Sequence, residues 1–154
     1  MNEENKNTLT LLTHEAHKEH AELRHLIETV KQRIDTARNT KARDTDRDLI
    51  QAIKQLCDHV EEHFQREENG GWLEEAVVRA PHLARRLGRL ERQHKPLCQR
   101  VQRLVAAAEA GKQGDKWLNE FEEKFAKFGR QLLAHETCEE RVLQKGFNDD
   151  LEID

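Results

Sequence analysis

The feature that most constrains this chain is a set of apolar stripes at helical spacing, each of which carries a histidine at a core position. The stripe in the second segment is Leu49, Ile53, Leu56, Val60, His63 and Glu67. Steps of three and four place these residues on one face of an α-helix. His63 and Glu67 therefore continue an apolar face. Burying an imidazole and a carboxylate there is costly unless each has a strong partner, and a metal cation is such a partner.

The same pattern returns near the C-terminus. The stripe there is Leu118, Phe121, Phe125, Phe128, Leu132, His135, Glu139 and Val142. His135-x-x-x-Glu139 thus repeats His63-x-x-x-Glu67, and a second glutamate follows in both copies, at Glu68 and Glu140. The chain therefore contains two copies of one helical motif.

Two further stripes each carry a single histidine. The first is Leu12, Ala16, His20, Leu23, Ile27, Val30 and Ile34, and the third is Leu83, Leu87, Leu90, His94, Leu97, Val101, Leu104 and Ala108. His14, His17 and His25 lie off the first stripe, so we expect them at the surface. His20 and His94 are the two histidines that we expect in the core.

The spacing of the core histidines indicates an internal repeat. His20 and His63 are 43 residues apart, and His94 and His135 are 41 apart. The sequence therefore predicts an all-α, up-down-up-down four-helix bundle made of two similar helical pairs. We assign residues 10–146 to this bundle, residues 1–9 to a polar N-terminal segment and residues 147–154 to an acidic C-terminal tail.

Helix ends are predicted from capping residues and glycines. The first helix is expected from Thr13 to Ala37 and the second from Asp46 to Glu68, ended by a left-handed turn at Gly70-Gly71. A short turn or helix is expected at residues 72–80, with Pro81 opening the third helix. After a turn at residues 111–114, the fourth helix should run from an N-cap at Asp115 to Lys145, with Gly146 as its stop.

Composition supports an all-helical protein and excludes several functions. Charged residues make up 36% of the chain, Gly and Pro are few, and Tyr is absent. Neither a signal peptide nor a membrane-spanning stretch is seen, so we expect a cytoplasmic protein that does not bind membranes. The net charge of −4 argues against nucleic-acid binding. We expect the arginines of the third helix to form a solvated, ion-paired surface (Arg79, Arg85, Arg86, Arg89, Arg92, Arg100 and Arg103).

The cysteines point to neither a disulfide framework nor a zinc knuckle. Cys57, Cys98 and Cys138 are odd in number, widely spaced and without a Cys-x-x-Cys motif. We expect them to be reduced packing residues. The candidate metal ligands are therefore the core histidines and glutamates.

Four imidazoles and two carboxylates are too many ligands for one tetrahedral zinc. They suit two adjacent ions, each held by two imidazoles and bridged by both carboxylates. Iron is the favoured metal on chemical preference, and zinc, manganese and nickel remain alternatives. The candidate metal ligands are His20, His63, Glu67, His94, His135 and Glu139.

These motifs resemble the hemerythrin-like, or HHE cation-binding, domain family over roughly residues 10–146. The resemblance rests on Glu19-His20-x-x-Leu23, His63-Phe64-x-x-Glu67-Glu68, the lone His94 and His135-x-x-x-Glu139-Glu140. It implies a four-helix bundle around a non-haem di-iron centre that binds, senses or handles oxygen, iron or nitric oxide. By position, the four histidines would be terminal ligands and the two glutamates bridges.

The match departs from the oxygen-carrying hemerythrins in two places. Their third helix supplies two histidines four residues apart, but here Leu90 and Cys98 flank His94 at that spacing. Their fourth helix supplies an aspartate five residues after its histidine, but here Glu139 follows His135 by four. The pattern is closer to symmetric hemerythrin-like domains used in sensing or iron handling. Open metal positions would remain unless water or a neighbouring side chain fills them (His59, Glu68, Cys98 or Glu140).

Three functions follow from this pattern. The leading one is a non-catalytic di-iron binding module that senses, stores or carries oxygen, iron or nitric oxide, with a small diatomic molecule such as O2 or NO as its expected ligand. The second is a di-iron oxidase or peroxidase-like enzyme that activates O2 at open coordination positions. The third is a helical adaptor with a purely structural metal. A sensor would need a separate output partner, and the sequence leaves open whether the chain forms a homodimer.

Overall fold

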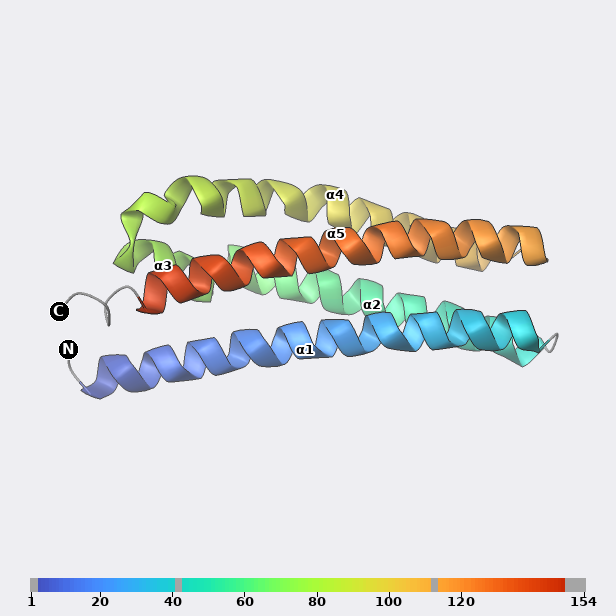
Figure 1. Ribbon diagram of the computed structural model, residues 1–154, viewed down its shortest axis with the longest axis horizontal. Helices are drawn as coiled ribbons and strands as arrows, with labels where there is room; N and C mark the ends of the chain where they lie inside the picture. The colour runs from blue at the N-terminus through green and yellow to red at the C-terminus, as the bar shows by residue number, and fades with distance from the viewer. Residues whose placement is uncertain (1–2, 41–42, 112–113, 149–154) are drawn as a thin grey trace.

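The chain folds into four long helices and one short one, as a computed structural model describing residues 3–40, 43–111 and 114–148 shows (Figure 1). The long helices are α1 (Glu3–Asn39), α2 (Arg43–Glu68), α4 (Ala84–Ala110) and α5 (Asp115–Asn148). The short helix α3 (Trp72–Arg79) is followed by a 3-10 turn, η1 (Pro81–Leu83). No strand occurs in the described ranges. The prediction of an all-α, hemerythrin-like four-helix bundle is confirmed.

The four long helices run alternately up and down and pack as a square. Helix α1 packs against α2 and α5, and α4 packs against the same two helices. The short α3 lies at the end of the bundle where α1 begins and α5 finishes, and it packs mainly on α5 (Figure 1). None of the described helices has a stretch long and apolar enough to span a membrane.

Glycines end two helices, the first as the sequence predicted and the second within the predicted turn at residues 111–114. Gly70 follows α2 with a φ of 86°, and Gly111 follows α4 with a φ of 48°. Only glycine adopts such left-handed conformations without a steric cost. The starts were predicted less well: α1 begins at Glu3 rather than Thr13, and α2 begins at Arg43 rather than Asp46.

The prediction that Gly146 stops the last helix is wrong. Helix α5 continues through Gly146 to Asn148, because this glycine serves packing rather than termination. A Cβ at residue 146 would lie 2.5 Å from the Cβ of Ala76 and 2.8 Å from its Cα, closer than real side chains approach. The glycine therefore lets α5 lie directly on α3.

The core consists of two apolar clusters with a polar layer between them. The larger cluster fills the bundle on the far side of His20 from α3 and includes Leu23, Ile53 and Phe125. The smaller cluster, under α3, includes Leu73 and Val142. The buried polar residues between these clusters are His20, His63, Glu67, His94, His135, Glu136 and Glu139.

Candidate metal centre

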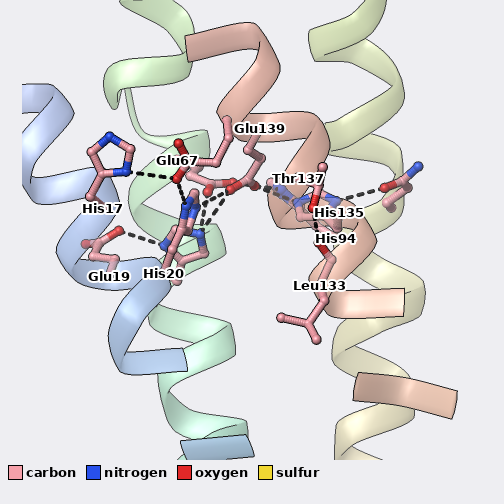
Figure 2. Close-up of polar contacts among 12 residues, drawn as sticks. His17, Glu19, His20, Glu67, His94, Leu133, His135, Thr137 and Glu139 are labelled. Carbon is pink, nitrogen blue, oxygen red and sulfur yellow. Dashed lines mark hydrogen bonds and ion pairs between the residues drawn. The ribbon is translucent and has the colours of Figure 1, made fainter. Parts of the chain in front are cut away.

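The structure brings all six predicted ligand residues together in the polar layer, and Figure 2 labels them all except His63. Each bundle helix contributes at least one of them, because each apolar stripe points its histidine to the bundle axis. None is more than 4% exposed: His20, His63, Glu67, His94, His135 and Glu139. The candidate donor atoms form two groups of four, and within each group all atoms lie within 4.8 Å of one another.

The first group, here called position A, contains His20, His63, Glu67 and Glu139. Nε2 of His20 lies 2.7 Å from Oε2 of Glu139, and Nε2 of His63 lies 2.6 Å from Oε1 of Glu67. Nε2 of His63 is also 3.4 Å from Oε2 of Glu139. Two imidazole nitrogens and two carboxylate oxygens therefore converge on one point.

The second group, position B, contains His94, His135 and the same two glutamates. Nε2 of His94 lies 3.0 Å from Oε2 of Glu67, and Nε2 of His135 lies 2.6 Å from Oε1 of Glu139. Each glutamate thus presents one oxygen to position A and the other to position B. This is the arrangement of two bridging carboxylates.

The two positions draw their donors from both halves of the chain. Position A takes three residues from α1 and α2 but needs Glu139 from α5. Position B takes three residues from α4 and α5 but needs Glu67 from α2. Neither helical pair holds a complete set of four donors.

Several inward-facing atoms are left without a hydrogen-bond partner in the described residues. They are both carboxylate oxygens of Glu67, Oε1 of Glu139, and Nε2 of His94 and of His135. These atoms lie close together, but their geometry does not suit hydrogen bonds. Buried polar atoms without partners are costly, and a cation would satisfy all of them at once. The donor set therefore fits two metal ions bound side by side.

The outward nitrogen of every core histidine contacts a side-chain oxygen. Nδ1 of His20 donates to Glu140 at 2.6 Å, and Nδ1 of His63 donates to Glu19 at 2.6 Å. Nδ1 of His94 donates to Glu68 at 3.0 Å. These bonds fix the tautomer in which the Nε2 lone pair points inward, as metal-binding histidines require. Glu68 and Glu140 thus support the candidate ligands and lie outside both four-donor groups.

The fourth outer contact breaks the symmetry between the halves. Nδ1 of His135 donates to Oε1 of Gln93 at 2.8 Å. Gln93 precedes His94 just as Glu19 precedes His20, so an amide occupies the place of a carboxylate. The two histidines of position A therefore both bond to carboxylates, and position B has one carboxylate and one neutral amide.

The carboxylates dominate the electrostatics of the layer. Burial lowers the pKa of His63, but its contacts with Glu139, Glu19 and Glu67 outweigh burial and raise that pKa to about 12. Burial raises the pKa of Glu139, but contacts with three imidazoles reverse the effect and hold it well below the usual range. Glu67 contacts only two imidazoles, so burial prevails and its pKa is raised. In the absence of metal the layer therefore retains protons.

Glu136 is a buried carboxyl that the sequence did not single out. It is 3% exposed, and neither oxygen has a hydrogen-bond partner in the described residues. Burial raises its pKa to about 7, in spite of the nearby charges of His20 and Arg24. The sequence could have indicated this burial, because Gly129, Glu136 and Leu143 follow one another at intervals of seven residues and so lie along one side of α5. All three are buried, beside the main apolar stripe of that helix.

Aromatic rings pack around the histidines. Phe64 stacks on His94 with ring centroids 4.0 Å apart, and Trp72 meets His20 edge-on at 5.9 Å. Trp72 is 5% exposed, so it covers the α3 end of the site. Its Nε1 has no hydrogen-bond partner within the described ranges. These rings limit the access of bulk water to the polar layer.

The other residues considered from the sequence lie elsewhere. His14, His17 and His25 are exposed as expected. His59 is half-buried and borders a surface depression between α1 and α2, and Cys98 packs beside the larger apolar cluster. Cys57 is a buried packing residue, but the same prediction is wrong for Cys138, which is exposed.

The fold and the donor set are those of a hemerythrin-like, cation-binding four-helix bundle. The family model described as the hemerythrin HHE cation-binding domain matches residues 11–143, and the chain belongs to this family. No curated protein and no solved structure gave a significant match. Cation binding is the property that the family and the buried His/Glu clusters share.

Proposed function

We propose that this protein binds two iron ions and uses them to bind, sense or handle a small molecule such as O2 or NO, or iron itself. The observation that carries the proposal is the sharing of Glu67 and Glu139 between two groups of buried donors. Two carboxylates that each present one oxygen to either group favour a pair of ions over a single ion.

The donor chemistry favours iron. Each position offers two imidazole nitrogens and two carboxylate oxygens, a set that suits iron, manganese and zinc, whereas no cysteine is among the donors. When bound, iron would supply a redox-active ion with coordination positions that the protein does not fill. Zinc would accept the same four donors as a closed tetrahedral site.

The chain's own residues would orient the ligands and exclude water. Glu19, Glu68, Gln93 and Glu140 hold the outer Nδ1–H of the four histidines, so each Nε2 lone pair is aimed inward. The apolar clusters on both sides restrict the layer to small molecules. We propose a cytoplasmic setting, and a sensor of this kind would need a separate output partner.

A second candidate function is a di-iron oxidase or peroxidase-like activity. Glu136 favours it, because a buried carboxyl with a pKa of about 7 beside the polar layer can hold a proton near neutral pH. Enzymes that activate O2 must deliver protons to the reacting centre, and such a group is suited to that step.

Elemental analysis of aerobically purified protein tests the leading proposal, with its visible spectrum recorded before and after dithionite. We expect about two irons per chain and a near-ultraviolet band that dithionite bleaches. A single zinc per chain, or a folded protein that takes up no metal, would contradict the proposal. Consumption of peroxide or ferrous iron by the loaded protein would favour the enzyme, and a spectral response to azide without consumption would favour binding.

A further inference from the structure

The surface between α4 and α5 contains a groove lined by cations. It consists of two adjoining depressions with volumes of about 520 and 390 Å3, which share Gln93 and Cys138. We call it the α4–α5 groove. Its charged lining residues are Arg86, Arg89, Arg92, Arg100, Arg141 and Lys145, and no carboxylate lines either depression.

These cations have no ion-pair partner among the residues that the structure describes. The sequence predicted an ion-paired outer surface for α4, and this is wrong in the groove: none of its six cations is ion-paired with a described carboxylate. Arg79 contacts Glu75 but lies outside the groove. The positive charge is therefore available to an external anion.

The shape of the groove favours an elongated ligand. Arg86 and Arg100 are 14 residues apart on α4, a distance of roughly 21 Å at about 1.5 Å per residue. A single phosphate would contact only one or two of these cations. A short peptide with several carboxylates would contact most of them.

The rest of the surface disfavours a long polyanion. Six of the 26 Lys and Arg residues line the groove. The rest of the chain has 20 Lys and Arg residues against 30 Asp and Glu residues, which gives it a formal charge of −10. A nucleic acid that extended beyond the groove would meet this negative surface. The groove also has no Phe, Tyr or Trp side chain on which a base could stack, and its one imidazole, that of His135, is buried.

The groove lies directly over position B. His135 contributes to its lining, and the exposed Gln93 connects the groove to the buried Nδ1 of His135 through its 2.8 Å hydrogen bond. A ligand in the groove would cover Gln93. No other outer partner of the four histidines borders this groove.

We propose that the α4–α5 groove is the docking site for an acidic segment of a partner protein, which lies against Gln93 when bound. The proposal goes beyond the proposed function because docking depends on the groove charges and not on the metal. If the protein holds no iron but still binds the acidic segment, the proposed function fails and this inference stands.

Fluorescence anisotropy with a labelled, glutamate-rich peptide of about 14 residues tests the proposal at about 0.15 M NaCl. The doubly reversed variant Arg89→Glu/Arg141→Glu should bind at least about tenfold more weakly. The control variant Arg103→Glu/Arg130→Glu makes the same charge change on the same helices outside the groove and should bind like the wild type. Equal affinity of the groove variant and the control would overturn the proposal.

The exposed Cys138 reports the location of the peptide. It borders both depressions, so bound peptide should slow its reaction with a maleimide several-fold in a Cys98→Ser background. An unchanged rate with saturating peptide would place binding elsewhere and overturn the assignment. Tighter, groove-dependent binding of an oligonucleotide of equal charge would also overturn it, in favour of nucleic acid.

Discussion

At the scale of single residues, Glu67 and Glu139, which belong to both groups of donors, distinguish this site from a cluster of buried ion pairs. In a network that only stabilised the fold, the buried carboxylate oxygens would accept hydrogen bonds. Neither oxygen of Glu67 accepts one in the described residues, although imidazole nitrogens lie 2.6 and 3.0 Å away. The ligand roles of all six residues remain a prediction. The physical reason for this prediction is the set of buried nitrogen and oxygen atoms that have no hydrogen-bond partner in the described residues.

His63→Ala and Glu139→Ala should each abolish stoichiometric metal binding, because each removes a donor and leaves buried charges without a partner. Cys138→Ser should keep the full metal content, since Cys138 lies in neither group of donors. Elemental analysis of the three purified variants measures the outcome. A full metal complement in both of the first two variants would refute the ligand assignment.

Glu19 and Gln93 occupy equivalent places in the two halves, but one is a carboxylate and the other a neutral amide. This difference should give the two metal positions unequal affinities. A carboxylate that accepts the Nδ1–H bond makes the imidazole a stronger donor, and such outer partners change metal affinity by about 10–100-fold. Gln93→Glu should therefore tighten position B, and Glu19→Gln should weaken position A.

Competition with a chromophoric chelator measures both effects as the two steps of metal release, and the reduction potential of the centre provides a second readout. Gln93→Glu should merge the two steps and lower the potential. Gln93→Ala removes the acceptor and serves as the control. If Gln93→Glu and Gln93→Ala released metal alike, the outer oxygen would have no electronic role.

At the scale of helices, periodicity accounts for how much could be predicted. His20, His63, His94 and His135 were placed correctly because a stripe in steps of three and four fixes which side of a helix faces the core. The start of α1 was missed because residues 3–8 are all polar and carry no apolar stripe.

Features that depend on contacts between helices were not predictable in this way. Gly146 has the sequence signature of a helix stop, and only the approach of α3 shows that it is a packing residue. The bond from His135 to Gln93 depends on how α4 and α5 are rotated about their axes. Glu136 lies beside the main stripe, where a charged residue normally faces solvent.

Gly146→Ala should destabilise the protein although it improves helix propensity. The new Cβ would overlap the backbone and Cβ of Ala76, and overpacking of this kind costs about 1–3 kcal/mol, against a propensity gain of about 1 kcal/mol. The net cost of up to about 2 kcal/mol corresponds to a melting temperature lower by up to about 8 °C, measured by circular dichroism.

The matched control for this prediction is Gly129→Ala on the same helix. Its Cβ would meet only Cγ2 of Ile27 at 3.9 Å, an ordinary van der Waals contact. The propensity gain should therefore raise the melting temperature. If the melting temperature rose in both variants, the contact between α3 and α5 would be able to accommodate the added methyl group without loss of stability, and the prediction would be wrong.

At the scale of the whole molecule, metal should reverse the dependence of stability on pH. Without metal, folding raises the pKa of His63 from 6.5 to about 12 and that of Glu136 from 4.5 to about 7. Their stabilisation is complete below the unfolded values and is lost as pH rises through the folded ones. The depressed pKa of Glu139 acts in the opposite sense, with stabilisation lost only as pH falls below 4.5.

The metal-free protein should therefore be most stable near pH 4.5–5, where the contribution of Glu139 is nearly complete and that of Glu136 has only begun to fall. Its melting temperature should fall between pH 6 and 9, as the contribution of His63 is lost. Bound metal needs deprotonated imidazoles, so the stabilisation that it adds should grow over the same range. Thermal melts of the apo and loaded forms at several pH values measure both trends. A metal-free melting temperature that rises from pH 6 to 9 would contradict the charge assignment.

The sharing of donors between the helical pairs also bears on how such a centre can originate. Each pair supplies two histidines and one glutamate that both groups of donors share, so a gene for a single hairpin would suffice if its product paired with its own copy. Fusion of two such genes would then free each half to accumulate its own substitutions. Glu19 and Gln93, which occupy equivalent places in the two halves, are one such difference in this chain.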